Sequence, residues 1–256
     1  YSRKKWSNLT FSEDDSIPNP ENGYLADPFI VDKQDRSYIF AERVDFVENK
    51  GKIAAYEVGD FPPKDLGIVL EEDFHLSYPF IFEDGDNLYL IPESSKNNDI
   101  RLYECELFPG KWRLHSIILD QVSAADSIVF QHQGKWWLFT NLNPSNTNDH
   151  CSELFIFSSD SLLGGPWLPH AKNPIYIDPI KARNGGLIFD GQDIYRVSQE
   201  QDYGVYGKNI NINKIILLNN ENYIEEKMHA GELDYLRVHH LHSNSSYTVY
   251  DKWSRK

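Results

Sequence analysis

Two sets of polar side chains recur at equivalent places along this sequence, and several of them are carboxyl groups that could transfer protons. Members of the first set open an apolar segment, and they are Asp27, Tyr78, Asp126, Asn184 or Gly185, and His239. Members of the second set close the aromatic segment that follows, and they are Glu42, Glu93, Asn141, Gln199 and Asp251. Crowded carboxyl groups push their pKa values apart, so that one can act as an acid and another as a base. A fold that gathers both sets would therefore build an acid–base site.

A five-fold repeat supplies the elements that position these residues. Each copy has an apolar strand, a turn with polar residues and an aromatic-rich strand, as in Tyr78–Phe82 followed by Tyr89–Glu93. The copies begin near residues 27, 78, 126, 185 and 239. Hairpins that repeat with a period of about fifty residues are typical of propeller blades. We therefore predict an all-β fold, a five-bladed β-propeller, formed by a single domain over residues 1–256.

The last copy is shorter than the others, which bears on how the ring closes. Each of the first four copies is followed by two further strand-like segments, such as Lys52–Val58 and Gly67–Leu70, whereas the fifth ends near Trp253. The apolar piece Lys5–Phe11 precedes the first copy and has no place in it. We expect this N-terminal segment to supply an outer strand of the last blade, because that would close the ring without an unpaired edge.

The first strand of a propeller blade lines the central channel, and the second strand returns antiparallel beside it. Both polar sets should therefore meet at one mouth of the channel, together with Arg183, which precedes the fourth copy. Charged side chains are buried only when they are paired or functional, so this convergence favours a site. A structural role stays open for Asp27, which could cap a strand locally. It also stays open for Glu42 and Glu93, which could pair with a nearby arginine.

The stretch Tyr195–Gly207 is dense in polar and aromatic residues and offers further ligand contacts. Arg196 could reach inward and Tyr206 could stack on a sugar ring, while packing between blades is the alternative role. Three histidines near residue 240 suggest a metal, but alternate residues of a strand point to opposite faces. We therefore expect no metal and no cofactor, and we expect His239 to hydrogen-bond to a sugar.

Composition excludes several classes of protein. The 25 Lys and Arg residues face 39 Asp and Glu residues, a formal charge of −14, so the chain should repel nucleic acid and anionic membranes. No apolar run approaches the roughly twenty residues of a membrane span, and the start does not resemble a signal peptide. Motifs for phosphate loops, serine hydrolases and zinc proteases do not occur. With Cys105 and Cys151 expected as buried free thiols, we predict a cytoplasmic location.

Seven short segments carry a family resemblance, and in chain order they are Ala26–Val31, Tyr89–Ser94, Ala125–Asp126, Arg183–Gly186, Tyr195–Gln199, Tyr206–Gly207 and Val238–Leu241. Together they resemble the propeller domain at the N-terminus of glucosamine inositolphosphorylceramide transferases, over essentially the whole chain. Similar domains occur in bacterial proteins of surface-polysaccharide loci. The resemblance implies an oligosaccharide, glycolipid or sugar-nucleotide ligand, and a fused or associated transferase domain as partner.

More distantly, Asp27 and Asp126 resemble two catalytic residues of five-bladed propeller glycosidases such as arabinanases, β-xylosidases, invertases and mannoside phosphorylases. Such enzymes use a first-blade Asp as base or nucleophile, a central Asp that tunes the site, and a later Glu as acid. The chain departs from that pattern at Arg183–Gly185, where the Glu would be expected. The remaining candidates for the acid are Glu93, Glu42 and Glu200.

These observations predict a carbohydrate-active enzyme that acts at a glycosidic bond, by hydrolysis, transfer or phosphorolysis, in surface polysaccharide or glycolipid metabolism. The expected catalytic residues are Asp27 as base or nucleophile, Glu93 as acid and Asp126 as modulator. The expected substrate-binding residues are Glu42, Tyr78, Arg183, Asn184, Arg196, Gln199, Tyr206, His239 and Asp251. The alternative is a non-catalytic glycan-binding module that accompanies a transferase, because function resides in the site rather than in the fold.

Overall fold

The computed structural model describes residues 1–2, 6–8, 16–145, 147, 149–202, 205–228 and 238–252. Nearly all regular structure in these ranges is strand, with short 3-10 turns η1 (Trp6–Asn8) and η3 (Ser95–Asn97). Alternating apolar residues and polar turns produce this outcome, because the turn residues interrupt any helical periodicity. Within the described ranges, no helix has the length and apolar character to span a bilayer.

Four sheets are built from consecutive strands, with the innermost strand first. The first sheet contains β1 (Gly23–Lys33), β2 (Arg36–Asp45), β3 (Lys50–Val58) and β4 (Lys64–Leu70). The second contains β5 (Ser77–Asp84), β6 (Asn87–Glu93), β7 (Asp99–Leu107) and β8 (Lys111–Asp120). The third contains β9 (Ala124–His132), β10 (Lys135–Leu142), β11 (Glu153–Ser159) and β12 (Leu168–Pro169), with β13 (Tyr176–Ile177) also paired to β11. The fourth contains β14 (Asn184–Asp190), β15 (Asp193–Asp202), β16 (Val205–Leu218) and β17 (Tyr223–Met228), and it continues into β18 (Leu241–Ser243) and β19 (Thr248–Tyr250).

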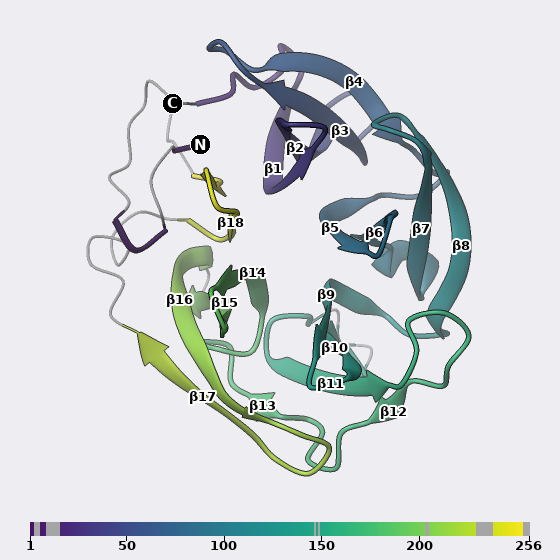
Figure 1. The fold of residues 1–256 in the computed structure, drawn as a ribbon, viewed down its shortest axis with the longest axis vertical. Coiled ribbons are helices and arrows are strands. Elements are labelled where there is room, and N and C mark those ends of the chain that lie inside the picture. The colour runs from purple at the N-terminus through teal and green to yellow at the C-terminus, as the bar shows by residue number, and fades with distance from the viewer. Residues whose placement is uncertain are drawn as a thin grey trace.

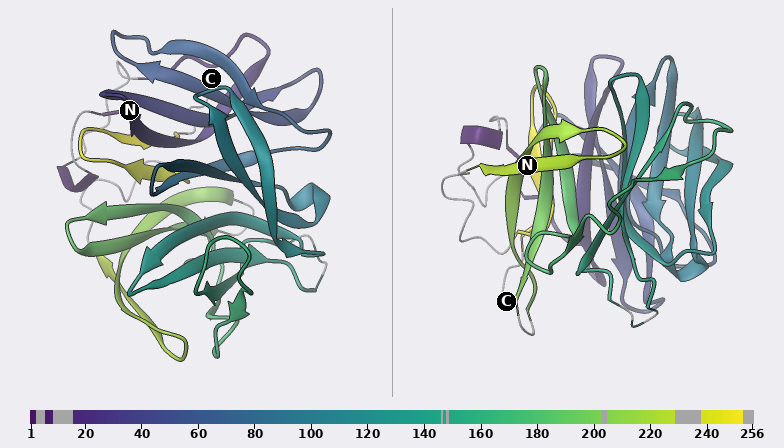
Figure 2. Two further views of the ribbon diagram at one scale, coloured as in Figure 1. Left: turned by 45° about the vertical axis from the view of Figure 1, so that its right-hand side comes forward. Right: turned by 90° about the horizontal axis from the view of Figure 1, so that it is seen from below.

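The sheets stand around a central channel. Figure 1 shows β1, β5, β9 and β14 nearest the axis, with the later strands of each sheet farther out. Seen from two further sides, neighbouring sheets stand face to face (Figure 2). The predicted all-β propeller fold is confirmed, and so is the expectation that the first strand of each repeat lines the channel.

The fifth repeat does not form a blade of its own in the part of the chain that the structure describes. Its strands β18 and β19 have three residues each, and β18 joins the fourth sheet through one parallel pair, Ile188 with Ser243. Two strands this short bury too little surface to stand alone. The described residues therefore form four sheets, and the predicted count of five blades is not confirmed.

A glycine allows β18 to lie so close to β14. A Cβ at Gly186 would lie 1.9 Å from the carbonyl oxygen of Leu241, and the φ of Gly186 is +140°. Any side chain at this position would clash with the backbone of β18 and would be strained in this conformation. The Gly pair of the fourth repeat thus has a packing role that its sequence position did not predict.

The N-terminal segment meets the last hairpin through Ser2. Ser2 and Thr248 exchange two backbone hydrogen bonds of 2.8 Å in an antiparallel bridge. Trp6 belongs to the turn η1 rather than to a strand, and its ring packs against Tyr195 at a centroid distance of 4.9 Å. The predicted outer strand, Lys5–Phe11, is therefore a turn where it is described, and residues 5 and 9–11 lie outside the described residues.

Aromatic residues of the innermost strands form the contacts between sheets. Phe29 is fully buried and lies 5.0 Å from the ring of Tyr78, 5.5 Å from that of Phe80 and 4.4 Å from that of His240. Burial of one such ring stabilises the fold by about 1.5–3 kcal/mol. These contacts hold the starts of β1 and β5 in a fixed relation, which matters for the residues beside them.

Neither cysteine forms a disulfide. Cys105 and Cys151 are free thiols, as expected, but both are only partly buried. Burial raises the pKa of each thiol, although Arg183 opposes the shift at Cys151. Both groups are therefore held in the protonated form at neutral pH.

Candidate functional site

Three equivalent backbone irregularities aim Asp27, Tyr78 and Asp126 toward one mouth of the channel. Each residue has a left-handed backbone, with φ angles of 49°, 44° and 48° respectively. Beside each one, the register of the innermost strand pair shifts, in β1–β2, β5–β6 and β9–β10. Such a β-bulge re-aims a side chain, and a non-glycine residue in this conformation costs about 1–3 kcal/mol. Strain repeated at three matching positions points to a site.

Asp126 is almost completely buried and pairs with Arg183. Arg183 Nε lies 2.6 Å from Oδ2 of Asp126, and Nη2 lies 3.4 Å from Oδ1. Gln199 Nε2 donates a further hydrogen bond of 3.0 Å to Oδ2. Burial raises the pKa of Asp126, while the Arg183 guanidinium opposes that shift. The two-pronged contact with Arg183 stabilises the carboxylate and fixes its orientation.

Glu93 shares the guanidinium of Arg183 with Asp126. Its Oε2 lies 3.9 Å from Arg183 Nη2. Its Oε1 accepts a hydrogen bond of 2.7 Å from Ser95 Oγ, which η3 places directly after the end of β6. Two residues predicted as catalytic from different repeats, Glu93 and Asp126, therefore meet at one arginine.

His239 stands between Asp27 and Asp251. Its Nε2 lies 3.3 Å from Oδ1 of Asp27, and its Nδ1 lies 3.0 Å from Oδ1 of Asp251. Burial by itself would lower the pKa of His239, but the two carboxylates raise it well above its ordinary value. Asp251 also accepts backbone N–H bonds of 3.0–3.2 Å from Asp27, His239 and His240. The predicted ligand contacts His239 and Asp251 thus bind each other and hold Asp27.

The same three residues have the spacing of a metal site. The ligand atoms of Asp27, His239 and Asp251 lie within 4.8 Å of one another. A metal ion requires a neutral imidazole, whereas the two flanking carboxylates favour the imidazolium. The arrangement therefore suits a protonated His239 better than a metal ion. That the site binds no metal stays a prediction.

Glu42 is paired with a histidine that sequence reasoning missed. His75 Nε2 lies 2.9 Å from Oε1 of Glu42, and His75 Nδ1 accepts the N–H of Gly51 at 2.9 Å. Burial raises the pKa of Glu42 to about 7, with Asp27 adding to the shift and His75 opposing it. A Cβ at Gly51 would lie 2.5 Å from the backbone oxygen of Leu76 and 2.8 Å from Oε1 of Glu42, so glycine is required beside the pair. No repeat position marks His75, and only its proximity to Tyr78 in the sequence could have suggested it.

We call this group the carboxylate mouth. It consists of Asp27, Glu42, His75, Glu93, Asp126, Arg183, His239 and Asp251. Its side chains come from strands of the first three sheets, from the loop before β5 and from the segments that flank the strands of the fourth sheet. Its five carboxyl groups share three basic partners, His75, Arg183 and His239, so every acid has a basic neighbour but the acids outnumber the bases.

Buried amides hold the loop that carries Arg183. Asn141 accepts the N–H of Asn184 at 2.9 Å and donates to the carbonyl oxygen of Ala182 at 3.0 Å. Asn184 in turn donates to the backbone carbonyl of Asp126 at 2.9 Å. The residues on both sides of Arg183 are therefore fixed, and Asn184 is used for this support rather than left facing a ligand.

Arg196 supports the same loop from the outer side. Its side chain is fully buried and pairs with Glu225 through contacts of 2.9 and 2.7 Å. It also donates to the carbonyl oxygen of Lys181 at 2.7 Å and to Oδ1 of Asn184 at 3.2 Å. Gln199 uses its amide on Asn184 O at 2.8 Å as well as on the buried aspartate. The structure thus places Arg196 and Gln199 behind the mouth, where they position it.

Tyr78 is the one aromatic member of the predicted set whose side chain is described. It is fully buried, and its hydroxyl has no hydrogen-bond partner among the described residues. Burial, with the charges of Asp126 and Asp27, raises its pKa well above the ordinary value. An unpaired buried hydroxyl is costly, so this group favours a ligand or water oxygen as acceptor. Tyr206 lies in β16, and its side chain is outside the described part of the chain.

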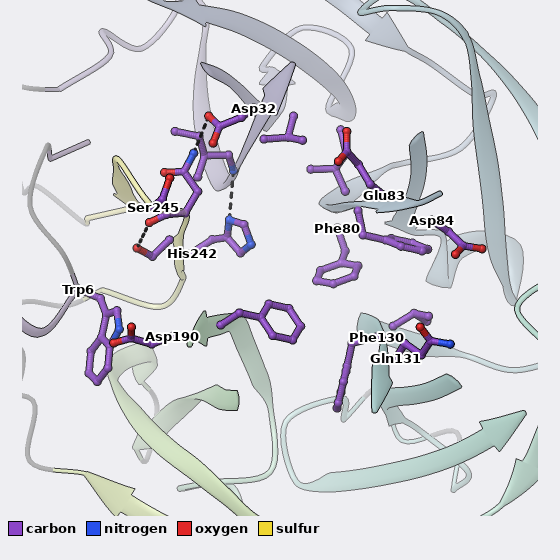
Figure 3. Close-up of a pocket in the computed structure, with 18 of the residues that line it drawn as sticks. Trp6, Asp32, Phe80, Glu83, Asp84, Phe130, Gln131, Asp190, His242 and Ser245 are labelled. Atoms are coloured by element: carbon purple, nitrogen blue, oxygen red, sulfur yellow. Dashed lines mark hydrogen bonds between the residues drawn. The ribbon is translucent and has the colours of Figure 1, made fainter. Parts of the chain in front are cut away.

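A wide cavity lies at the other end of the channel, where the sequence predicted no site. Its volume is about 760 Å³, and Phe80, Phe130 and His242 surround it (Figure 3). Its rim carries the carboxylates of Asp32, Glu83, Asp84 and Asp190. We call this end the aromatic mouth. The open space and the paired carboxylates therefore lie at opposite ends of the channel.

Comparison with known proteins identifies the family. Residues 9–240 match the sequence profile of the N-terminal region of glucosamine inositolphosphorylceramide transferase 1. The chain belongs to this family. It is 36% identical over 218 residues to the transferase of that name from Oryza sativa subsp. japonica, and 38% identical over 212 residues to that from Arabidopsis thaliana. The resemblance predicted from the sequence is confirmed.

The matched regions cover the family members unequally. The alignments span 83% and 80% of this chain but only 29% and 27% of the rice and Arabidopsis proteins. The chain therefore corresponds to less than a third of the curated relatives that it matches.

Solved structures share the fold at low sequence identity. A family 117 glycoside hydrolase from Zobellia galactanivorans superposes with a TM-score of 0.63 and 13% identity, covering 93% of this chain and 77% of the hydrolase. An α-L-arabinanase from Penicillium chrysogenum gives 0.59 and 10%, covering 93% of this chain and 78% of the arabinanase. Identities this low establish a common fold, in agreement with the predicted distant resemblance to propeller glycosidases.

Proposed function

We propose that the chain is a carbohydrate-active enzyme that acts at a glycosidic bond, by hydrolysis or by transfer or phosphorolysis, in glycolipid or surface polysaccharide metabolism. The observation that carries the proposal is the meeting of carboxylates from three repeats, Asp27, Glu93 and Asp126, at one mouth. Shifted pKa values and strained backbone gather where a protein does chemistry. The name of the curated relatives, a sugar transferase, and the hydrolases that share the fold support a carbohydrate substrate.

Asp27 is the proposed base or nucleophile. His239 Nε2 lies 3.3 Å from its Oδ1, and Asp251 accepts its backbone N–H, so the side chain is held in place. Asp27 would either take a proton from the attacking water or acceptor hydroxyl, or attack the anomeric carbon directly. The distance between the two reacting carboxyl groups in a bound complex would decide between these routes.

Glu42 suits the role of acid better than Glu93 does. Its raised pKa of about 7 keeps much of it protonated at neutral pH, as a general acid requires. The His75 N–H donates to Oε1, which leaves Oε2 to carry the proton. Glu93 instead faces Arg183 and accepts a hydrogen bond from Ser95, so both of its oxygens already lie beside donors. We therefore assign proton donation to Glu42.

Asp126 and Arg183 are proposed to tune the charge of the mouth and to orient the ligand. The unpaired hydroxyl of Tyr78 would donate to a ligand oxygen. Glu200, the third candidate acid, pairs with Lys208 at 3.5 Å and has no contact with the carboxylate mouth among the described residues.

The test separates turnover from binding on a panel of glycosides, sugar phosphates and sugar nucleotides. Asp27→Asn and Glu42→Gln should each lower turnover by about 10²–10⁴-fold while calorimetry shows ligand affinity close to wild type. Glu93→Gln is the matched control and should lose less than Glu42→Gln. If ligands of the panel bind but none is turned over, the proposed enzymatic activity is contradicted.

One observation favours the alternative, a glycan-binding module that accompanies a transferase. Asp126 is already paired with Arg183, and Asp27 with His239, so much of their hydrogen-bonding capacity is used inside the protein. The much greater length of the relatives leaves room for a separate transferase domain. In this alternative, joining the module to the rest of such a protein should raise glycan affinity without adding a second reaction.

The finer architecture belongs to the same proposal. We propose a single propeller domain whose fifth blade is the β18–β19 hairpin, with the N-terminal segment closing the ring. The Ser2–Thr248 bridge and the hydrogen bond from Ile30 N to His242 Nδ1 support this, because they tie the hairpin to the N-terminal segment and to β1. Deletion of residues 1–8 should then lower stability through loss of the edge contact.

A further inference from the structure

An exposed aromatic pair stands at the rim of the carboxylate mouth. The rings of Tyr24 in β1 and Phe46, which follows β2, lie 6.1 Å apart between centroids at 46°. Tyr24 is 39% exposed, Phe46 63% and the adjacent Val47 85%. Two adjacent rings this exposed contribute little to the core and offer flat apolar faces to a ligand.

Strand register places this pair on the same face as Glu42. In the β1–β2 ladder Tyr24 is opposite Val44, and Ala26 is opposite Glu42. Opposite residues of an antiparallel pair point to one side, and so do residues two apart on a strand. The bond from Phe46 N to the carbonyl oxygen of Asn22 continues the pairing by one more step.

Electrostatics agree with this placement. Burial raises the pKa of Tyr24 to about 12, and the charges of Glu42 and Asp27 add to the shift. Tyr24 therefore lies within reach of the field of both carboxyl groups, and its hydroxyl stays protonated. A ligand that touches the Tyr24 ring would thus extend toward Glu42.

We propose that Tyr24 and Phe46 form a sugar subsite, in which one pyranose ring stacks its C–H face on the aromatic pair while its glycosidic oxygen lies toward Glu42. This inference rests on the proposed function and names the part of the site that recognises the leaving or accepting sugar. Aromatic rings bind sugars through their flat apolar faces, while the neighbouring carboxyl groups supply hydrogen-bond acceptors. The size of the pair, two rings, matches one sugar ring rather than an extended protein contact.

Saturation-transfer NMR with methyl pyranosides of glucose, galactose, mannose and glucosamine tests the subsite. In the wild type, saturation should reach the C–H protons of one sugar face. Phe46→Ala and Tyr24→Ala should each weaken binding by about ten-fold, whereas Tyr24→Phe, which keeps the ring, should stay near wild type. Leu107→Ala removes an equally exposed side chain, 68% exposed at the end of β7, and serves as the matched control.

The outcomes separate this inference from the function on which it rests. If a glycoside binds and Asp27→Asn alters its turnover or affinity, but Phe46→Ala and Tyr24→Ala do not weaken it, the subsite is overturned and the proposed function stands. If the wild type binds none of the methyl glycosides at millimolar concentration, the subsite is overturned, and turnover of the wider panel of glycosides, sugar phosphates and sugar nucleotides still decides the proposed function. Equal losses in Leu107→Ala would show a general effect on folding and would also overturn the subsite.

Discussion

The two mouths of the channel are formed by opposite ends of the same strands, yet they differ in kind. At the carboxylate mouth, charged side chains are buried and paired, as Asp126 is with Arg183 at 2.6 Å. At the aromatic mouth, a cavity of about 760 Å³ is open, and Glu83 on its rim pairs with Lys33, where both side chains are partly exposed. The carboxylate mouth therefore contains buried, paired charges, whereas the aromatic mouth contains accessible space. Chemistry and room for a ligand need not coincide in a propeller.

The largest difference in stability between the two mouths is expected when one buried charge is removed. Arg183→Ala would leave Asp126 buried without its partner, and stability should fall by about 3–5 kcal/mol. Lys33→Ala at the aromatic mouth removes a partly exposed partner of an exposed carboxylate and should cost less than about 1 kcal/mol. Urea unfolding of both variants measures the difference. Similar losses in the two variants would contradict the idea that only one mouth depends on buried pairing.

The second-largest effect is expected from Glu42, in the free energy of unfolding measured as a function of pH. The folded protein keeps this proton up to about pH 7, whereas the unfolded chain releases it near its ordinary pKa of 4.5. Stability therefore falls as the pH rises from about 4.5 to 7, by roughly 3 kcal/mol for this group alone. Glu42→Gln should remove that part of the decline, and Glu83→Gln at the aromatic mouth should not. Wild-type and Glu42→Gln curves that stay parallel would refute the burial effect.

The groups that face Glu42 set the controls for this titration. His75 contacts it directly, while Asp27 and Glu93 act on it through space. His75→Gln removes the opposing positive charge, so it should move the end of the decline to a higher pH. A shift in the other direction would mean that His75 does not stabilise the Glu42 carboxylate.

The amide supports should give a smaller effect. Asn141→Ala removes bonds to Asn184 N and Ala182 O from a fully buried side chain, and should cost about 1–3 kcal/mol. Asn244→Ala at the aromatic mouth removes exposed hydrogen bonds to Asp32 and to the N–H of Ser246, which solvent can replace, and should cost about 1 kcal/mol or less. Thermal unfolding of the two variants provides the comparison. An equal cost would show that burial does not distinguish the two ends.

The smallest effect is expected from an aromatic side chain at the open mouth. Phe189 is 55% exposed, so Phe189→Ala should change stability by about 1 kcal/mol or less. Phe29→Ala, in the closed core, should cost about 3–5 kcal/mol. Calorimetric melting of both variants tests whether the aromatic wall serves the cavity rather than the fold. A large loss in Phe189→Ala would make it part of the core.

Much of the architecture was predictable because the repeat acts through local rules. Strands, turns and the convergence of Asp27, Glu93 and Asp126 follow from period-two alternation and from hairpins repeated at a fixed spacing. The blade count was not confirmed at the last hairpin, since β18 has only three residues and pairs with β14 of the fourth sheet. A strand's existence is a local property, whereas its sheet depends on partners far away in sequence.

Parts of the site could not be predicted because they depend on three-dimensional contacts. Arg196 was expected to bind a ligand. Its guanidinium instead forms an ion pair with Glu225, which lies two strands away in the sheet. His75 occupies no repeated position, and its pairing with Glu42 depends on the missing side chain at Gly51. Periodicity predicts the side of a strand to which a residue points, but it does not predict which residue its side chain contacts there.

At the three left-handed bulges, the backbone conformation sets the direction of the side chain whatever its residue type. Asp27, Tyr78 and Asp126 share one backbone conformation, although one of them is a phenol and two are acids. Because each repeat bears the cost of the geometry in its own backbone, a new reaction would need only a new residue at an existing position. A carboxylate at position 78 would inherit this placement, at the cost of the ring contact that Tyr78 makes with Phe29 between β1 and β5.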